Sequence, residues 1–274
     1  MIVKTLLENT AVSADFRQEH GLSLYIETKG HRILFDAGAT GAFAENAKKM
    51  GVVLADVDYA VLSHGHYDHG GGLGRFLEEN QKAKVYVRSG AFNNHLARRK
   101  NGDLEEIGLD KALQNTGRIA YTGARFEIAG GVELFSGVTG RYFFSASNRV
   151  LLAERNGAPE EDDFGHEQNL IVEEDGKLVL FAGCAHNGIA NIMNRLKEIK
   201  GRDADFVFGG FHLHNPSANT SEPAGLILSL GEYLKNTGSV FFTGHCTGDA
   251  PFELLKSVLG DRLNRLSTGM TVEV

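Results

Sequence analysis

Three histidines and an aspartate occur within six positions, directly after an apolar run, and this stretch constrains the fold more than any other. The four residues are His64, His66, Asp68 and His69, and the apolar run covers residues 57–62. Neutral imidazole and carboxylate are ligand types that zinc and related divalent metals take. Two histidines at i and i+2 on an extended segment point the same way, so His64 and His66 can bind one ion. Asp68 and His69, just past the turn, can then face a second ion.

A polar loop whose histidines bond only to the backbone is the alternative interpretation. A single histidine is easily incidental, but three histidines and an aspartate at ligand spacing favour a metal site. Glycines follow the loop and a helical pattern begins behind them. The pattern therefore predicts a strand that delivers a short metal-binding loop to the start of a helix.

His-x-His-x-Asp-His at the end of a strand resembles the signature of the metallo-β-lactamase-fold hydrolases. The resemblance implies an α/β fold, a four-layer αββα sandwich in which the metal ligands come from several strand ends. It also implies a divalent metal cofactor. We expect two zinc ions, with manganese or iron as alternatives.

The composition is that of an ordinary globular chain, with 42% hydrophobic and 23% charged residues among 274. The formal net charge of −7 disfavours a nucleic-acid partner or an anionic membrane surface. The N-terminal residues lack the pattern of a signal peptide, and no stretch is long enough to span a bilayer. Both cysteines lie in motif-like loops, so no disulfide is expected. These features predict a cytoplasmic protein with a small-molecule substrate, and they leave homo-oligomerisation open.

The hydrophobic pattern gives a strand, strand, helix, strand order that occurs in both halves of the chain, as an αββα sandwich requires. No linker-like change in composition is present, so we expect one domain over residues 1–274. Residues 89–165 are less regular and predict an insertion or lid. The expected strands cover residues 1–8, 22–27, 31–38, 57–62, 84–87, 118–121, 125–128, 132–135, 169–173, 178–182, 206–208 and 240–242. The expected helices cover residues 42–50, 73–79, 187–199, 226–234 and 252–259.

Further candidate ligands follow two later strands. Cys184 and His186 lie where the wider superfamily places a metal-bridging aspartate or cysteine, between a hairpin strand and a helix. A thiolate at Cys184 would bind zinc tightly. His245 lies at the end of the last core strand, where the fold supplies its final histidine ligand. Cys246 follows it and, by strand alternation, is expected to point the other way and pack.

Two positions have roles that the sequence leaves open. His166 follows a glycine at the distance where many superfamily members have the third histidine of the first metal site, so it competes with His186 for that role. A surface loop histidine is the alternative. Asp36 ends a Leu-Phe-Asp-x-Gly strand, and in this fold such an aspartate usually orients the loop and a ligand by hydrogen bonds. A plain turn aspartate is its alternative.

A narrower resemblance rests on segments spread over residues 1–250. They are similar to metal-dependent hydrolases often described as related to dihydropterin ribofuranosylaminobenzene phosphate synthase, a step of methanopterin biosynthesis. Within this branch His212 and His20 are candidates for a proton donor or a phosphate contact, or for histidines that bond the backbone under the cleft. The other three histidines, His31, His95 and His214, are taken as surface or structural. The segments are 19–24, 34–38, 63–73, 183–189, 209–213 and 244–248.

The chemistry implied is hydrolysis by a metal-bound hydroxide. Asp68 would orient the nucleophile while it binds the second ion, and His212 would protonate the leaving group. Nearby cations at Arg98, Arg99 and Arg141 suit a small anionic ester, such as a phosphate.

Several alternatives remain for the activity. They are a pterin-related synthase or transferase, a single-iron oxygenase on the same fold, and a binding module that keeps metal for structure. Flavin-linked di-iron members of the fold carry Glu where this chain has His66, which disfavours that form of redox chemistry.

Overall fold

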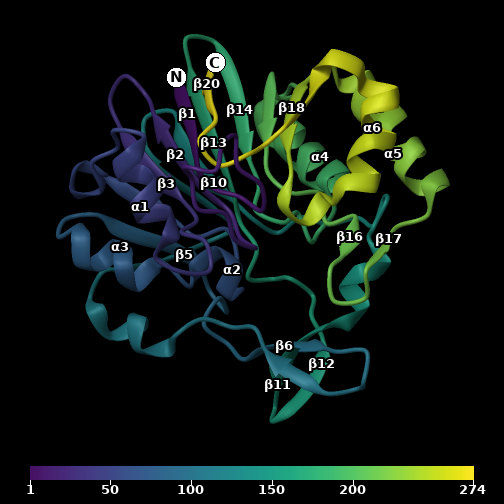
Figure 1. Cartoon of the computed structure of the whole chain (residues 1–274), viewed down its shortest axis with the longest axis horizontal. Helices are drawn as coiled ribbons and strands as arrows, with labels where there is room; N and C mark the ends of the chain where they lie inside the picture. The colour runs from purple at the N-terminus through teal and green to yellow at the C-terminus, as the bar shows by residue number, and fades with distance from the viewer.

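The computed structural model describes all 274 residues and consists of two mixed sheets packed face to face, with helices on both outer sides. Figure 1 shows the N-terminal half with its helices on one side of the sandwich and α4, α5 and α6 on the other. The layers are therefore helix, sheet, sheet and helix, which confirms the predicted αββα sandwich. No helix combines the length and apolar character that crossing a membrane requires.

The first sheet contains seven strands in the order β20-β1-β2-β3-β4-β5-β8. The pairs from β3 through β4 and β5 to β8 are parallel, so the loops after β3 and β4 leave from the same edge. In chain order the strands are β1 (Ile2–Leu7), β2 (Ser23–Glu27), β3 (Arg32–Phe35), β4 (Tyr59–Val61), β5 (Lys84–Arg88), β8 (Ile119–Thr122) and β20 (Thr271–Glu273).

The second sheet also has seven strands, in the order β19-β18-β15-β14-β13-β10-β9. Its β13–β14 hairpin turns at Asp175 and Gly176, whose φ angles of 51° and 76° match the turn that a two-residue hairpin prefers. The strands are β9 (Arg125–Ala129), β10 (Val132–Phe135), β13 (Asn169–Glu174), β14 (Lys177–Phe181), β15 (Phe206–Phe208), β18 (Val240–Thr243) and β19 (Leu263–Arg265).

The helices bury one apolar face against each sheet. In α4, the predicted stripe of Ile189, Ile192, Met193 and Leu196 is buried, and Gly201 ends the helix in the left-handed conformation. The α-helices are α1 (Ala42–Lys49), α2 (Tyr67–Gly70), α3 (Leu73–Glu79), α4 (Ile189–Lys200), α5 (Ala224–Thr237) and α6 (Asp249–Leu259). Short 3-10 helices are η1 (Leu54–Asp56), η2 (Lys111–Thr116), η3 (Ala146–Val150), η4 (His245–Thr247) and η5 (Gly260–Arg262).

Phenylalanines hold the two sheets together. Phe35 from the first sheet lies against Phe181 from the second, with 6.1 Å between ring centroids. Within the second sheet, Phe208 and Phe242 on neighbouring strands stack at 4.6 Å with nearly parallel planes. Each buried phenylalanine stabilises the fold by roughly 1.5–3 kcal/mol through the removal of apolar surface from water. This rigid interior fixes the strand ends from which the polar loops leave.

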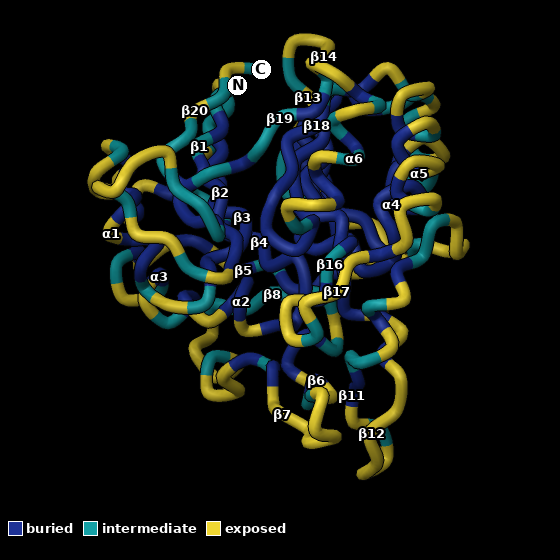
Figure 2. Tube along the Cα trace, turned by 45° about the vertical axis from the view of Figure 1, so that its right-hand side comes forward, coloured by how far each residue is buried: buried dark blue, intermediate teal, exposed yellow.

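Residues 89–165 divide between the core and a separate small sheet. β8, β9 and β10 belong to the two main sheets, whereas the remaining strands form a four-stranded sheet in the order β12-β11-β6-β7. Figure 2 shows that this small sheet lies beyond the main sandwich and that its outer strands are exposed. The sequence pattern predicted neither these strands nor the β16–β17 hairpin. They are β6 (His95–Arg98), β7 (Leu104–Glu106), β11 (Leu151–Arg155), β12 (Ala158–Glu161), β16 (His214–Asn215) and β17 (Thr220–Ser221).

Candidate metal centre

The histidine-rich loop leaves β4 and runs into the short helix α2, as the sequence pattern predicts. The glycines after it are required because backbone from other segments lies against them. A Cβ atom on Gly71 would lie 2.2 Å from the carbonyl oxygen of Ala39, and one on Gly72 would lie 2.2 Å from that of Ala37. Only glycine permits such close contact with these carbonyl oxygens, which holds the loop against the edge of the first sheet.

Three histidines from two loops face one another and form the first donor group. The ring centroids of His64 and His66 lie 4.6 Å apart, and His186 lies 4.9 Å from the first and 5.0 Å from the second. The Nε2 atom of each ring is buried and has no hydrogen-bond partner. Unpartnered buried polar atoms are rare in proteins. A ring nitrogen of His64 lies within 4.8 Å of one of His66, and a ring nitrogen of His64 lies within 4.8 Å of one of His186, a spacing that fits a bound cation.

Burial and neighbouring histidines lower the pKa of His64, His66 and His186 well below the usual value. The rings are therefore neutral at physiological pH, which is the state in which imidazole binds a metal. His186 is fixed by Asn148, whose Oδ1 lies 3.0 Å from the ring Nδ1 and whose Nδ2 donates to the backbone carbonyl of His186. With Nδ1 engaged, Nε2 remains available.

Asp68, His69, Cys184 and His245 form a second donor group beside the first. His69 Nε2 lies 3.1 Å from both Cys184 Sγ and His245 Nε2, and His245 Nε2 lies 3.2 Å from Asp68 Oδ2. One atom from each of the four residues lies within 4.8 Å of every other. Two imidazoles, a carboxylate and a thiol are a donor set that suits zinc or iron.

The charges of the second group depend on its neighbours. Burial would raise the pKa of Asp68, but the charge of His69 and hydrogen bonds from His20 and His245 outweigh it and lower that pKa well below its usual range. Burial raises the pKa of the Cys184 thiol. A thiolate at Cys184 therefore requires a cation beside it, and a coordinated metal deprotonates a thiol.

Asp36 lies directly behind both groups. Its carboxylate accepts hydrogen bonds from Ser63 N, from Ser63 Oγ and from His69 Nδ1, each at 2.7 Å. Ser63 Oγ also lies 2.8 Å from His64 Nδ1. Asp36 has a φ of 60°, a strained conformation for a residue with a side chain, which the surrounding bonds maintain. The Asp36 carboxylate thus orients His69 of the second group directly and His64 of the first group through Ser63.

His245 is held from the N-terminal segment. The Oδ1 atom of Asn9 lies 3.0 Å from His245 Nδ1, and the Glu8 carboxylate accepts a short hydrogen bond from the backbone N–H of His245. The ring of His20 lies 4.7 Å from the ring of His245, and its Nε2 is 3.3 Å from the Asp68 carboxylate. Residues 8–20 therefore lie against one side of the second donor group.

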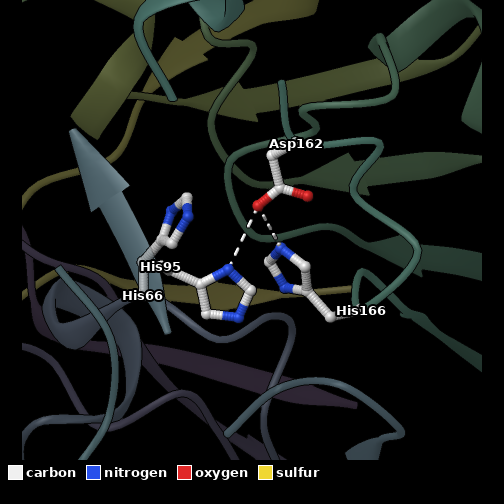
Figure 3. A group of neighbouring side chains, drawn as sticks. All are labelled: His66, His95, Asp162 and His166. Atoms are coloured by element: carbon white, nitrogen blue, oxygen red, sulfur yellow. Dashed lines mark hydrogen bonds and ion pairs between the residues drawn. The ribbon is translucent and has the colours of Figure 1, made fainter. Parts of the chain in front are cut away.

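His166 lies beside the first donor group, but both of its ring nitrogens are engaged elsewhere. Its Nδ1 accepts a hydrogen bond from the Gly65 N–H at 2.9 Å, and its Nε2 lies 3.0 Å from Asp162 Oδ2. His95 Nδ1 lies 3.1 Å from the same oxygen (Figure 3). Burial would raise the pKa of Asp162, but hydrogen bonds from His166 and His95 outweigh it and lower that pKa. His95 is thus a buried residue of this network.

Cys246 faces the donor groups, contrary to the expectation from strand alternation. Its Sγ lies within 4.8 Å of Cys184 Sγ and of a His212 ring nitrogen. The strand ends at Thr243, and residues 245–247 form the helical turn η4, where His245 has a φ of 49°. Alternation applies only to extended backbone, so the turn redirects the thiol.

Members of both donor groups, His66 and His186 from the first and Asp68 and Cys184 from the second, line one open cleft. Both ring nitrogens of His212 are buried there without partners. The small sheet contributes Arg98 and Arg99 to the wall. Arg141 does not line it, because its guanidinium lies over the Phe144 ring at 4.4 Å. The remaining lining residues are His20, His66, Tyr67, Asp68, Ala97, Ile107, Ser147, Val150, Leu151, Cys184, His186, Asn215, Pro216, Ser217 and Cys246.

Sequence reasoning missed the side chains that orient the candidate ligands. Asn9, Asn148 and Glu167 each contact the site through a hydrogen bond to a candidate ligand. Ser63 and Glu167 had a local signal, because Ser63 directly precedes the histidine pattern and Glu167 directly follows His166, whereas Asn9 and Asn148 lie in segments with no metal-binding motif. The others could be found only from the folded chain.

Comparisons with known proteins agree with this arrangement. The family model of the metallo-β-lactamase superfamily matches residues 17–222. An uncharacterized protein of Methanocaldococcus jannaschii is 31% identical, covering 90% of this chain and 91% of that protein. The 7,8-dihydropterin-6-methyl-4-(β-D-ribofuranosyl)-aminobenzene-5'-phosphate synthase of the same organism is 26% identical, covering 99% and 96%.

A solved structure is similar over the whole length. Tm1679, described as a metal-dependent hydrolase of the β-lactamase superfamily, has a TM-score of 0.80 and 26% identity, covering 100% of this chain and 99% of that one. The matched region contains the histidine pattern that ends β4 and the cysteine and histidine that follow β14. On its fold, its ligand pattern and these matches, the chain belongs to the metallo-β-lactamase superfamily.

Proposed function

We propose that this protein is a metal-dependent hydrolase that acts on a small anionic ester, with phosphate esters as the first class to test. One observation carries the proposal. Three buried histidine nitrogens without partners lie beside a four-residue donor group, and members of both groups line one cleft. This arrangement supports a binuclear centre, for which we propose two zinc ions.

His64, His66 and His186 would hold the first ion, and Asp68, His69, Cys184 and His245 the second. Ions bound there would supply a Lewis acid and lower the pKa of a water molecule to about 7. Asp68 has its carboxylate between His20 and His245, where it can orient that water. His212 lines the cleft with both ring nitrogens free, where it can protonate a leaving group.

The cleft wall offers one uncommitted cation for an anionic substrate. Arg99 is held by Glu105 through its Nε and donates a short hydrogen bond to Ser217. Arg98, on the same strand, forms no ion pair or side-chain hydrogen bond and also lines the cleft. A guanidinium without a protein carboxylate favours a substrate carboxylate or phosphate.

The test combines metal content with turnover. Protein purified without chelator or affinity tag is expected to hold two zinc ions per chain and to hydrolyse aryl phosphate or phosphodiester substrates. His66→Ala should lose turnover by at least about a hundredfold with the fold retained, since an incomplete ligand set removes the activated water. His31→Ala, which changes a histidine outside the cleft, is the matched control. Equal turnover in the wild type and His66→Ala would reject hydrolysis at this site.

The pterin-related synthase reaction is the second candidate, and the similarity to the synthase of Methanocaldococcus jannaschii over nearly the whole chain favours it. Incubation with a ribofuranosylaminobenzene phosphate and a dihydropterin that carries a leaving group, such as a diphosphate, on its 6-methyl carbon, followed by mass analysis, separates the two reactions. A condensation product would identify synthase activity. A single iron per chain with uptake of oxygen would instead favour an oxygenase.

A further inference from the structure

The histidine expected to compete for the first metal site belongs to a hydrogen-bonded network beside it. Figure 3 shows Asp162 between His95 and His166, with His66 alongside. One carboxylate oxygen, Oδ2, faces a ring nitrogen of each histidine, at 3.1 and 3.0 Å, and the other, Oδ1, accepts the Phe164 N–H at 2.7 Å. All four side chains are buried.

The network determines which nitrogen of His166 carries a proton. The Gly65 N–H can only donate, so His166 Nδ1 must accept it and is unprotonated. Nε2 then carries the proton and donates to Asp162. His95 holds Asp162 from the other side, since both of its ring nitrogens face acceptors, Asp162 Oδ2 and the Gly90 carbonyl oxygen. A carboxylate that fixes the tautomer of an imidazole is a known device in active sites.

The peptide that receives this hydrogen bond lies between two candidate ligands. Gly65 separates His64 from His66, and it packs so closely that an added Cβ would lie 2.2 Å from the Ala91 carbonyl oxygen and 2.8 Å from His95 Nε2. Because this peptide joins the two residues, its orientation affects how the rings of His64 and His66 are placed. His166 is therefore placed to set that orientation.

We propose that His166 is a positioning residue, not a metal ligand, and that Asp162 and His95 fix its tautomer so that it holds the Gly65 peptide between two ligands of the first ion. The four residues are close enough to be considered as a cation site. The ring nitrogens of His95 and His166, however, already face Asp162 or the backbone, whereas His66 has a buried Nε2 without a partner and its ring lies 5.0 Å from that of His186. This inference rests on the metal centre of the proposed function but not on the reaction that it catalyses.

The experiment compares zinc binding by metal-free protein and variants, in competition with a chromophoric chelator. His166→Phe keeps a ring but removes the acceptor, and its affinity for the first zinc ion should fall about 10- to 100-fold while two ions still bind at saturation. His166→Asn places an amide oxygen near the position of Nδ1 and should restore most of the affinity. Asp162→Asn should weaken binding without changing the number of ions. His186→Ala should bind one ion fewer.

Two results would overturn the proposal. One is the loss of a whole zinc equivalent in His166→Phe or Asp162→Asn, which would make the network a ligand set. The other is unchanged affinity in His166→Phe.

A second measurement uses metal-free protein without substrate, so its result does not depend on whether the proposed function is correct. In metal-free protein, ¹⁵N NMR should show His166 protonated at Nε2 only, and the Gly65 amide should exchange at least about tenfold faster in His166→Phe than in His166→Asn, because only the latter retains an acceptor. Protonation at Nδ1, or equal exchange in both variants, would contradict the assignment.

Discussion

Asp36 Oδ2 lies 2.7 Å from His69 Nδ1, and neither side chain has exposed surface. The same carboxylate receives both hydrogen bonds of Ser63, which in turn contacts His64. A strand end in the first sheet thus links one candidate ligand of each donor group. The geometry of the candidate metal centre therefore depends on Asp36 and Ser63, side chains at the sheet edge that are not themselves candidate ligands.

Asp36→Asn should therefore weaken both donor groups. The amide keeps the size of the side chain but provides one acceptor where three hydrogen bonds converge, so His69 loses its fixed orientation. Loss of such an orienting partner typically costs 10- to 100-fold in metal affinity, and we expect a reduction of that order for zinc. Asp58→Asn is the matched control, because Asp58 also accepts from a backbone N–H, of Arg32, but pairs with Lys82 far from the cleft. Equal zinc affinity in Asp36→Asn and the wild type would contradict this prediction.

Metal removal should destabilise the fold measurably. The three unpartnered Nε2 atoms cost about 1–3 kcal/mol each when they are buried without a partner. Zinc at a hundredfold excess over its dissociation constant stabilises the folded state by about 2.7 kcal/mol. Thermal unfolding followed by circular dichroism should show a midpoint that falls after chelation and recovers on addition of zinc. An unfolding midpoint insensitive to zinc would exclude a site that binds tightly in the folded state.

Arg98 should affect substrate binding more than turnover. Removal of a charged hydrogen-bond donor costs about 1.5–3 kcal/mol when it is buried, and Arg98 is exposed, so solvent reduces its effect. We expect Arg98→Ala to raise KM for an anionic ester about tenfold at low salt with little change in kcat. Arg141→Ala is the control, since Arg141 packs on Phe144 outside the cleft lining. A fall in kcat with unchanged KM would place Arg98 in another role.

The ligand loop could be predicted from the sequence because its information is local. His64, His66, Asp68 and His69 follow a strand at a spacing that directs their side chains to one side, and the parallel sheet brings Asp36 to the same edge. Most of the main strands and helices likewise follow from apolar periodicity, but the short edge strands β19 and β20 were not predicted.

The remaining parts depend on contacts between distant segments. Asn148 reaches His186 across 38 positions, and His166 reaches Gly65 across 101, so no spacing rule identifies either contact. His166 and His186 have similar local patterns, and only the hydrogen bonds of the folded chain separate them. The prediction for Cys246 is wrong because a left-handed residue, His245, interrupts the extended backbone on which alternation depends.

Gly183 offers a test of how tightly the centre is packed. A Cβ at this position would lie 2.2 Å from Ser63 Oγ and 3.1 Å from His64 Nδ1, so Gly183→Ala must displace the hydroxyl that links Asp36 to His64. Overpacking of this kind costs about 1–3 kcal/mol of unfolding free energy, and zinc affinity should fall with it. Denaturant unfolding of the metal-free protein measures the first effect and chelator competition the second.

Gly74→Ala is the matched control for that substitution. Gly74 lies within α3 and has open space where a Cβ atom would lie, so an alanine there should stabilise the protein by about 0.5–1 kcal/mol and leave zinc binding unchanged. The two variants add the same methyl group and are expected to move stability in opposite directions. If Gly183→Ala bound zinc like Gly74→Ala, the contact between Ser63 and His64 would not be needed to hold the first donor group.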